Sequence, residues 1–219
     1  MSPLGGRRVV VTAGGTREPI DPVRFLGNRS SGKMGWALAL AALARGAEVI
    51  LVTAATPPPA TRGLTVITAE TADEMHARVR ESLSPGAVLI MAAAVADYRP
   101  RERAARKLKK RAEGLTLDLV PTIDILLSLA RDAMRDQLFV VGFAAETDDV
   151  VRNGQAKALG KRLDLCVIND IAQPGIGMGA DDNAVTIVDR NGLVLELPRA
   201  PKRAIADAIL ALIEERLTR

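Results

Sequence analysis

The sequence is short of cysteine, histidine and aromatic residues, and each shortage narrows the kinds of protein that it can encode. Its single cysteine, Cys166, cannot form a disulfide within the chain, which suits a reducing compartment. With one histidine, His76, the sequence gives no support to a histidine-based catalytic triad. Aromatic residues make up only 2% of the chain, which argues against a surface on which single-stranded nucleic acid stacks its bases.

The sequence also lacks a long apolar run. A membrane-spanning helix needs about 20 consecutive apolar residues, and the first residues do not contain the apolar stretch of a signal peptide. A chain of 219 residues has the usual length of one domain and can bury a core without disulfides. We therefore expect a single soluble, cytoplasmic domain over residues 1–219, with no membrane partner.

Positive charge is concentrated in one segment. Between Arg99 and Arg111 there are eight basic residues and one acidic residue, a net charge of +7 that leaves −3 for the rest of a chain whose total is +4. Such a basic run by itself is more often a solvated or nucleic-acid-binding face than part of a catalytic site. The sequence thus describes a mildly acidic body with one strongly basic segment.

Short apolar runs rich in β-branched residues alternate with stretches of helical periodicity. Runs that are apolar on both faces are typical of strands covered by helices on each side, as in a parallel sheet. The expected strands are 8–12, 48–53, 64–67, 87–91, 138–142 and 163–168. The expected helices are 33–44, 72–82, 123–134 and 147–161. This alternation predicts an α/β fold, a Rossmann-like, doubly wound and mostly parallel sheet.

The C-terminal part of the chain has a different pattern. Strand-like runs at 184–189 and 193–197 flank Asn191 and Gly192, a strong signal for a hairpin turn, and a helix is expected at 201–217. Two connections, 13–32 and 93–122, are long for a compact domain, and such connections are usually functional or disordered. Ligands of doubly wound sheets bind beyond the carboxyl ends of the strands, so we expect the chemistry there.

The first long connection has the composition of an anion site. Its glycines Gly14, Gly15 and Gly32 let backbone N–H groups approach a phosphate closely, and a helix is expected to begin just after them. Ser30 and Ser31 offer hydroxyl groups and are expected to cap that helix.

Two common nucleotide-binding motifs come close to fitting this connection, but neither one does. Gly27, Gly32 and Lys33 match the start of a Walker A loop, but Met34 replaces the hydroxyl residue that holds magnesium. The dinucleotide-binding G-x-G-x-x-G pattern is absent, and the second strand ends near Thr53 without an acidic residue for a ribose. The anion site is therefore not of either common type.

The same connection carries a family resemblance. Residues 12–35 read TAGGTREPIDPVRFLGNRSSGKMG, which closely resembles the opening of the bacterial phosphopantothenoylcysteine synthetase domain. Three later segments match this family in order and spacing: AAAVADYRP at 92–100, KLKK at 107–110 and GFAAET at 142–147. The similarity continues through Lys157, Lys161, Asp164 and Asn169, and so covers nearly the whole chain.

The resemblance implies a two-step ligase reaction. A carboxylate of phosphopantothenate attacks the α-phosphate of CTP, giving an acyl cytidylate and pyrophosphate. The amine of cysteine then displaces CMP to form an amide. Bacterial members of the family favour CTP and need Mg²⁺, whereas human-type members use ATP, and this sequence resembles the bacterial ones.

The resemblance also implies catalytic roles for three positions. Asn28 would donate a hydrogen bond to the carbonyl of the acyl cytidylate, and Arg24 would bind the phosphate or carboxylate of the substrate. Lys107, in the basic segment, would lie on a flexible loop that closes over the active site and excludes water from the intermediate.

The remaining matched positions would bind the nucleotide. Asp97 would contact it or hold Mg²⁺, Phe143 would pack on the cytosine or ribose, and Lys157 and Lys161, one helical turn apart, would reach it from one helix face. The full nucleotide-binding set is Gly14, Gly15, Ser31, Gly32, Met91, Ala92, Ala93, Asp97, Lys107, Ile123, Asp124, Ile125, Leu126, Phe143, Lys157 and Lys161. One departure follows the basic segment, where relatives commonly have Asn-Pro-Asp-Ile: this chain has Pro121-Thr-Ile123-Asp124-Ile125, so Asp124 is kept in register but the proline before it is not.

The family implies two kinds of protein partner. Members generally form homodimers, for which the expected hairpin near Asn191 offers one possible edge, and the domain is often fused behind a flavin-dependent phosphopantothenoylcysteine decarboxylase. We expect that decarboxylase as a separate subunit or as part of a longer protein. Nucleic acid is not an expected partner.

Two other functions fit parts of the sequence. A nicotinamide-dependent reductase fits the fold, but the glycine fingerprint and a Tyr-x-x-x-Lys pair are missing, since the only tyrosine, Tyr98, is followed by Arg-Pro-Arg-Glu. A nucleic-acid-binding module fits the basic segment, and predicts a steep dependence of affinity on salt, but leaves the first long connection unexplained.

Overall fold

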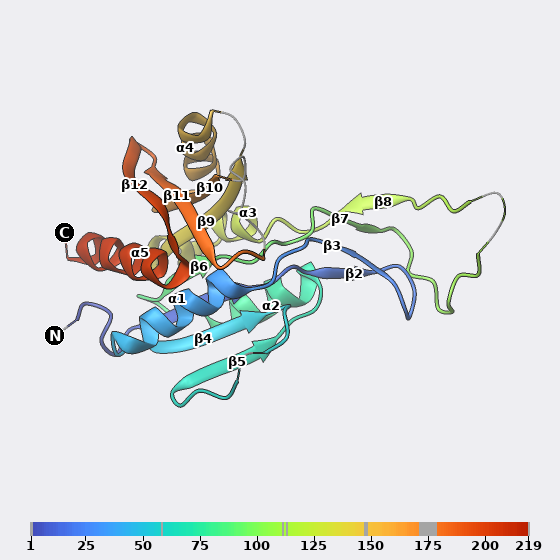
Figure 1. The fold of residues 1–219 in the computed structure, drawn as a ribbon, viewed down its shortest axis with the longest axis horizontal. Helices are drawn as coiled ribbons and strands as arrows, with labels where there is room; N and C mark the ends of the chain where they lie inside the picture. The colour runs from blue at the N-terminus through green and yellow to red at the C-terminus, as the bar shows by residue number, and fades with distance from the viewer. Residues whose placement is uncertain are drawn as a thin grey trace.

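The computed structural model describes residues 2–57, 59–110, 112, 114–146, 149–170 and 179–218. Its centre is an eight-stranded sheet (Figure 1). In spatial order the strands are β12 (Gly192–Pro201), β11 (Asp182–Asp189), β10 (Leu165–Asp170), β9 (Phe139–Glu146), β6 (Val88–Met91), β1 (Arg8–Ala13), β4 (Glu48–Thr53) and β5 (Leu64–Thr68).

The sheet has the doubly wound strand order that the sequence predicts. From β5 to β10 all neighbouring strands are parallel, whereas β11 and β12 form an antiparallel hairpin at one edge. Numbered along the chain, the parallel strands lie in the order 3-2-1-4-5-6, and successive crossovers leave β1 in opposite directions. The Rossmann-like α/β class and the C-terminal hairpin are both confirmed.

Helices cover both faces of this sheet. On one face α1 (Lys33–Ala44) and α5 (Lys202–Leu217) pack on Val9 and Val11 of β1, and on the other α2 (Ala72–Ser82), α3 (Ile125–Ala130) and α4 (Val150–Gly160) contribute to the core that contains Val10. Consecutive residues of β1 thus enter opposite cores, which is why the strand is apolar on both faces. Among the described residues, no helix has both the length and the apolarity to cross a lipid bilayer.

Two helices differ from the sequence prediction. The helix expected at 123–134 ends at Ala130, because Asp132 accepts a hydrogen bond from the Met134 N–H and starts a separate 3₁₀ turn, Ala133–Gln137. The helix expected at 147–161 begins at Val150, and residues 147–148 lie outside the described residues.

The two long connections contain short strands that the sequence does not predict. The first forms the pair β2 (Arg17–Pro19) and β3 (Phe25–Gly27), and the second forms β7 (Tyr98–Pro100) and β8 (Leu119–Pro121). With the described residues that join each pair, these strands make a projection that we call the arm. Figure 1 shows the arm extending away from the central sheet, on the side opposite the N- and C-termini.

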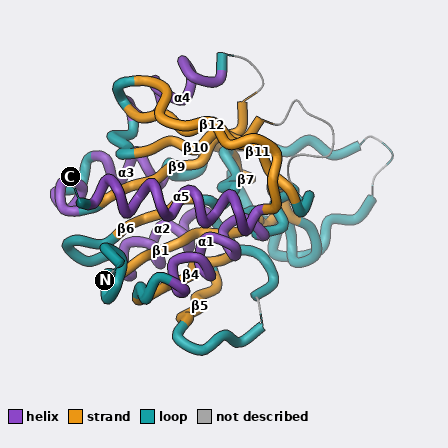
Figure 2. The backbone as a smooth tube through the Cα atoms, turned by 60° about the vertical axis from the view of Figure 1, so that its left-hand side comes forward, coloured by secondary structure: helices purple, strands orange, loops and turns teal. Residues whose placement is uncertain are grey.

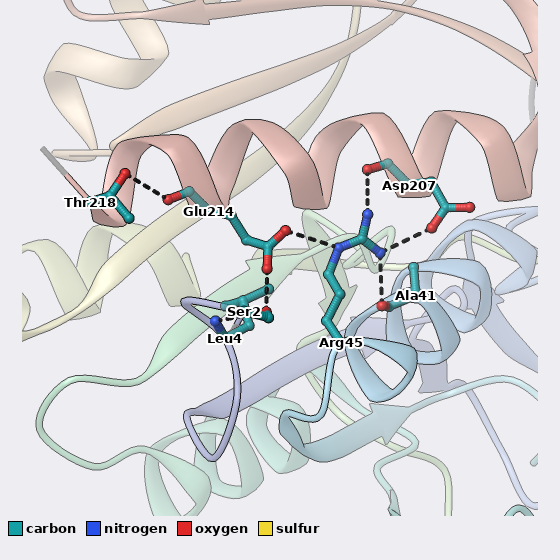
Figure 3. A network of polar contacts seen from close by, with 7 residues as sticks. All are labelled: Ser2, Leu4, Ala41, Arg45, Asp207, Glu214 and Thr218. Carbon is teal, nitrogen blue, oxygen red and sulfur yellow. Dashed lines mark hydrogen bonds and ion pairs between the residues drawn. The ribbon is translucent and has the colours of Figure 1, made fainter.

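A polar network joins α1, α5 and the N-terminal segment (Figure 3). The guanidinium of Arg45, just after α1, contacts Asp207 Oδ1 at 3.0 Å and Glu214 Oε2 at 3.2 Å, both on α5. It also donates to the carbonyl of Ala41, and Ser2 donates to the other oxygen of Glu214. The network ties the C-terminal end of α1 to α5, and the two helices lie side by side (Figure 2).

The start of α1 depends on two glycines. Its N-cap is Gly32, with a φ of 78°, and no side chain caps the helix, so the expected capping by Ser30 or Ser31 is wrong. Glycine is favoured because this left-handed conformation strains other residues. At Gly35 a Cβ atom would lie 2.6 Å from the Thr12 carbonyl oxygen and 2.6 Å from Ala13 Cβ, so the helix rests directly on β1.

Substitution of Gly35 by alanine is expected to lower the free energy of unfolding by about 1–3 kcal/mol, the usual cost of overpacking a core. The backbone of β1 cannot move away as a flexible side chain could. Gly160→Ala is the control, because a Cβ there has no atom within 4 Å. Urea unfolding of both variants measures the difference, and equal stabilities would contradict the close packing of α1 on β1.

The reactivity of the Cys166 thiol reports whether β10 is buried. Its side chain is 1% exposed, and burial raises the pKa of its thiol to about 11. We therefore expect negligible reaction with a disulfide reagent at pH 8 in the folded protein and rapid reaction once guanidinium unfolds it. Rapid labelling of the native protein, followed by absorbance, would show that β10 is not the buried strand described.

Candidate active site

A cavity of about 520 Å³ lies at the carboxyl ends of the central strands. Its walls include residues 30–35, which follow the arm's β2–β3 pair and enter α1, and residues 91–97, which follow β6. Further walls come from residues 122–126, from β9 and from α4. Since β1 and β6 are neighbours at the point where the crossovers diverge, the cavity occupies the position at which doubly wound folds bind ligands.

Most of the predicted nucleotide-binding residues line this one cavity. They come from five separated parts of the chain, and the fold brings them together. The lining includes Ser31, Gly32, Met91, Ala92, Ala93, Asp97, Ile123, Asp124, Ile125, Leu126, Phe143, Lys157 and Lys161. Their roles toward a nucleotide stay predictions.

Gly14 and Gly15 lie behind the cavity wall rather than in it. Gly14 has a φ of 84°, and its carbonyl accepts a hydrogen bond of 2.8 Å from Ala94 N, while Gly15 forms a bridge with Ala94. These contacts hold the segment after β6 against the segment after β1. Both glycines therefore shape the wall without contributing to its lining.

Asn28 lies at the edge of the same wall. Its side-chain Nδ2 donates to the carbonyl oxygens of Ala94 at 3.2 Å and Val95 at 3.1 Å, and both of these residues line the cavity. The amide is thus held beside the lining, with its donor group directed at two main-chain carbonyls. A carbonyl oxygen of a ligand could take the place of one of them.

Arg24 and Lys107 are not among the cavity residues. Arg24 Nη2 lies 2.5 Å from the buried carboxylate of Asp21 and 2.8 Å from the carbonyl of Leu108, and Lys107 is exposed on the arm. Arg24 thus contacts the residue that follows Lys107 in the chain, but neither Arg24 nor Lys107 lines the cavity. Their predicted roles toward the substrate stay untested.

The two predicted lysines, Lys157 on α4 and Lys161 directly after it, both have carboxylate partners. Lys157 Nζ lies 2.5 Å from Glu146 Oε1, and Lys161 Nζ lies 2.8 Å from Asp124 Oδ2. Burial alone raises the pKa of Asp124, but the hydrogen bonds from Lys161 and the Leu127 N–H outweigh it and hold that pKa below its ordinary value. The ion pairs keep both ammonium groups at the cavity wall.

Two further lysines and two amides line the cavity without having been predicted as site residues. Lys33 Nζ pairs with Asp181 at 2.6 Å, while the Lys202 ammonium, buried at the start of α5, donates to the carbonyls of Ala180 and Asp182. Burial, and next the charge of Lys33, lower the pKa of Lys202. The additional lining amides are Asn169 and Asn183, which are hydrogen-bonded to each other at 2.8 Å.

The sequence indicates a site role for one of these two lysines but not for the other. Lys33 stands inside the glycine-rich connection and could have been included with Gly32. Lys202 could not, because it opens a helix far along the chain and belongs to no motif of the connection. Four lysines line the cavity, three of them held by carboxylates, and their ammonium groups are the kind of donor that binds the oxygens of a polyanion.

One lining carboxylate is suited to a divalent cation. Asp124 already pairs with Lys161, whereas the Asp97 carboxylate makes no hydrogen bond or ion pair with any described residue. Within the described residues, no group of three or more histidine, cysteine or acidic side chains is placed to hold a metal ion. A single carboxylate fits Mg²⁺ carried by phosphates, because Mg²⁺ is usually bound by one or two carboxylates, phosphate oxygens and water.

Comparisons with known proteins agree with this geometry. Residues 4–217 match the family described as the DNA/pantothenate metabolism flavoprotein C-terminal domain. The chain is 42% identical over 216 residues to the coenzyme A biosynthesis bifunctional protein CoaBC of Vibrio cholerae, covering 98% of this chain and 54% of that protein. Against the protein of the same name from Bacillus subtilis it is 43% identical over 210 residues, covering 95% of this chain and 51% of the relative.

A solved structure is also similar over the full length. It is the crystal structure of the C-terminal domain of a coenzyme A biosynthesis bifunctional protein CoaBC, with a TM-score of 0.80 and 39% identity, covering 100% of this chain and 99% of that one. The chain spans about half the length of the curated relatives. The resemblance noted in the sequence is confirmed: this chain belongs to the CoaBC family, in which it corresponds to the phosphopantothenoylcysteine synthetase domain.

Proposed function

We propose that the chain, as a single ligase domain over residues 1–219, joins phosphopantothenate to cysteine at the expense of CTP in coenzyme A biosynthesis. The observation that carries the proposal is the placement of Asn28 beside a lysine-rich cavity at the switch point of the sheet. Two relatives named for coenzyme A biosynthesis and a solved domain of such a protein support it.

The first step joins the acid to the nucleotide. A carboxylate oxygen of phosphopantothenate forms a bond to the α-phosphorus of CTP, and the bond from that phosphorus to the pyrophosphate oxygen breaks. Lys33, Lys157, Lys161 and Lys202 line the cavity and would neutralise the phosphates, which repel the incoming carboxylate. The lysines held by Glu146 and Asp124 are ordered in advance, so less entropy is lost on binding.

The second step forms the amide. The cysteine nitrogen attacks the acyl carbon, the bond to the CMP oxygen breaks, and the amine proton is lost to solvent or to the leaving phosphate. Asn28 would donate from Nδ2 to the acyl oxygen as negative charge develops there. A preorganised donor of this kind contributes about 2.7–4 kcal/mol to the stability of a transition state.

Magnesium has one suitable ligand in this cavity. Asp97 would hold Mg²⁺ together with the triphosphate, and the ion would neutralise phosphate charge when bound. Phe143, from β9, would pack against the cytosine or ribose. The preference for CTP over ATP is part of the proposal and rests on the resemblance to the bacterial members of the family, from which this chain departs in having Ile123 rather than proline before Asp124.

Asn28→Ala is expected to lower kcat for amide formation by roughly 10²–10³, the loss typical of removing one oxyanion donor. Pyrophosphate release should still occur in the variant, because Asn28 acts after the nucleotide has been attacked. Release is measured with CTP, Mg²⁺ and phosphopantothenate, with and without cysteine, and CMP and amide are quantified by chromatography.

Gln155→Ala is the matched control, since this amide bonds to the Arg190 carbonyl and lies outside the cavity lining. It should retain wild-type turnover. No pyrophosphate from the wild type with either CTP or ATP would contradict the proposed ligase. A variant Asn28→Ala with unchanged amide formation would contradict the role of Asn28 alone.

We also propose that two copies of the chain associate through the arm. Six large apolar side chains on the arm are at least 36% exposed, and apolar surface of this extent usually marks an interface. They are Val23, Phe25, Tyr98, Leu115, Leu117 and Leu119. The basic segment on the same arm would face the acidic body of the second copy. A flavin-dependent decarboxylase, fused or separate, is the other protein partner that we propose.

Leu115→Glu is expected to weaken self-association at least roughly tenfold, because a charge would replace an apolar anchor in the interface. Leu193→Glu tests the hairpin of β11 and β12 instead, as Leu193 is 53% exposed and Leu115 is 56% exposed. Sedimentation equilibrium measures both. Dissociation by Leu193→Glu alone would place the interface at the hairpin edge and contradict the arm.

A further inference from the structure

Two asparagine side chains in the cavity wall are hydrogen-bonded to each other and have no role in the proposed reaction. Asn169 lies at the carboxyl end of β10 and Asn183 at the start of its antiparallel neighbour β11, and both line the cavity. Asn169 is opposite Val185 in the ladder, so Asn183, two residues before Val185, has its side chain on the same face of the sheet. The fold thus brings together two amides that are 14 residues apart in the sequence.

The backbone decides which way the amide of Asn183 is turned. This side chain is 3% exposed, and its Oδ1 accepts a hydrogen bond of 3.1 Å from Ala184 N. A backbone N–H can only donate, so the oxygen and not the NH₂ group must lie on this side of the amide. The pairing of β11 with β12 shifts register between Asn183 and Val185, an irregularity that often redirects side chains beside a site. The NH₂ group of Asn183 is therefore turned toward other acceptors.

The orientation of Asn183 determines that of Asn169. Asn183 Nδ2 donates to Asn169 Oδ1 at 2.8 Å and lies 3.9 Å from Sδ of Met34, a weak acceptor on α1. If the amide of Asn169 were reversed, two NH₂ groups would face each other and both would lack an acceptor, which is costly away from water. The Oδ1 of Asn169 is thus used within the wall, whereas its Nδ2 makes no hydrogen bond with any residue that the structure describes.

We propose that Asn183 is a positioning residue, which fixes the amide of Asn169 so that its NH₂ group is available to the ligand. Asn169 is half-buried and lines the cavity, so a bound molecule can reach this group. Asn183 itself is buried and acts only through its neighbour. The pair therefore offers the ligand a donor and not an acceptor, although asparagine carries both.

The surroundings of that NH₂ group favour a phosphate oxygen as its partner. An NH₂ group offers two donors and no acceptor. Lys202 donates to the carbonyl of Asp182, the residue before Asn183, so a cation lies in the same part of the wall. An anionic oxygen accepts hydrogen bonds from both kinds of donor. The phosphates proposed for this cavity belong to the nucleotide and to phosphopantothenate, and on this point the inference rests on the proposed function.

Exchange of the two side-chain NH₂ groups with water tests the orientation in the wild type without any ligand. Measured by NMR, the Asn169 NH₂ protons should exchange roughly tenfold faster than those of Asn183, because only the latter are hydrogen-bonded. Equal or slower exchange at Asn169 would overturn the proposal. This comparison does not depend on activity, so it still decides the orientation if the wild type shows no ligase turnover and the proposed function fails.

Addition of CTP and of phosphopantothenate in separate samples identifies the source of the phosphate. Neither compound reacts without the other, so each spectrum reports binding alone. The ligand whose phosphate accepts from Asn169 should shift the resonances of that NH₂ group and slow its exchange. If both ligands bind and neither changes this group, the contact with the ligand is refuted.

Asn183→Asp is expected to reverse the neighbouring amide. The new carboxylate keeps the bond from Ala184 N but has no NH₂ group, so it accepts from Asn169 and turns the Asn169 oxygen toward the ligand. The affinity for CTP or phosphopantothenate, measured by titration calorimetry, should fall roughly tenfold or more. Asn183→Leu breaks both bonds but leaves the Asn169 amide free to turn either way, so it should bind more tightly than Asn183→Asp. The opposite order of affinities is what a purely structural role predicts, and it would overturn the positioning role.

A double-mutant cycle separates the turned amide from the new negative charge. Asn183→Asp is also made in an Asn169→Ala background, where the charge still repels the ligand but no amide can turn. The fall in affinity should be clearly smaller in that background, and an equal fall in both would overturn the positioning role. Asn191→Asp, the same chemical change in the hairpin turn outside the cavity, is the matched control and should bind as the wild type does. If circular dichroism shows that Asn183→Asp does not fold, the exchange rates of the wild type decide.

Discussion

A parallel sheet must be covered on both of its faces, and the arrangement of this protein follows from that requirement. Strands such as β1 send alternate valines into two separate cores, so the chain has to pass a helix over each face. The crossovers on the two sides of β1 run in opposite directions. No connection therefore passes directly between β1 and β6, and the space at their carboxyl ends stays open. The lysine-rich cavity lies in this space. Its position therefore depends on the order of the strands and not on the identity of the side chains that line it.

The central sheet could be predicted from the sequence because its strands are short, apolar and rich in β-branched residues. The arm could not, since strands of three residues such as β2 and β7 are too short to show a period of two. The predicted capping by Ser30 and Ser31 failed for a different reason. Gly32 occupies the N-cap position of α1 in the left-handed conformation, and no side chain makes a capping hydrogen bond there.

The site was predictable where the sequence carries a motif and not where the fold alone makes the contact. The residues after β6 and on α4 were recognised through a family resemblance, and the fold brings them into one cavity. Lys202 reaches the same cavity from the start of α5, and its neighbours in sequence show no sign of a site. Arg24 was assigned to the substrate by resemblance, whereas its contacts in this chain are with Asp21 and Leu108.

The close packing of α1 on β1 places the chain's one tryptophan at an informative position. Trp36 follows Gly35 directly, lies in the first turn of the helix that borders the cavity, and packs partly buried against the core shared with α5. Indole fluorescence depends on local polarity, so its emission would follow changes at the start of α1. The protein therefore contains an intrinsic fluorescent reporter next to the cavity, and its signal is not mixed with that of another tryptophan.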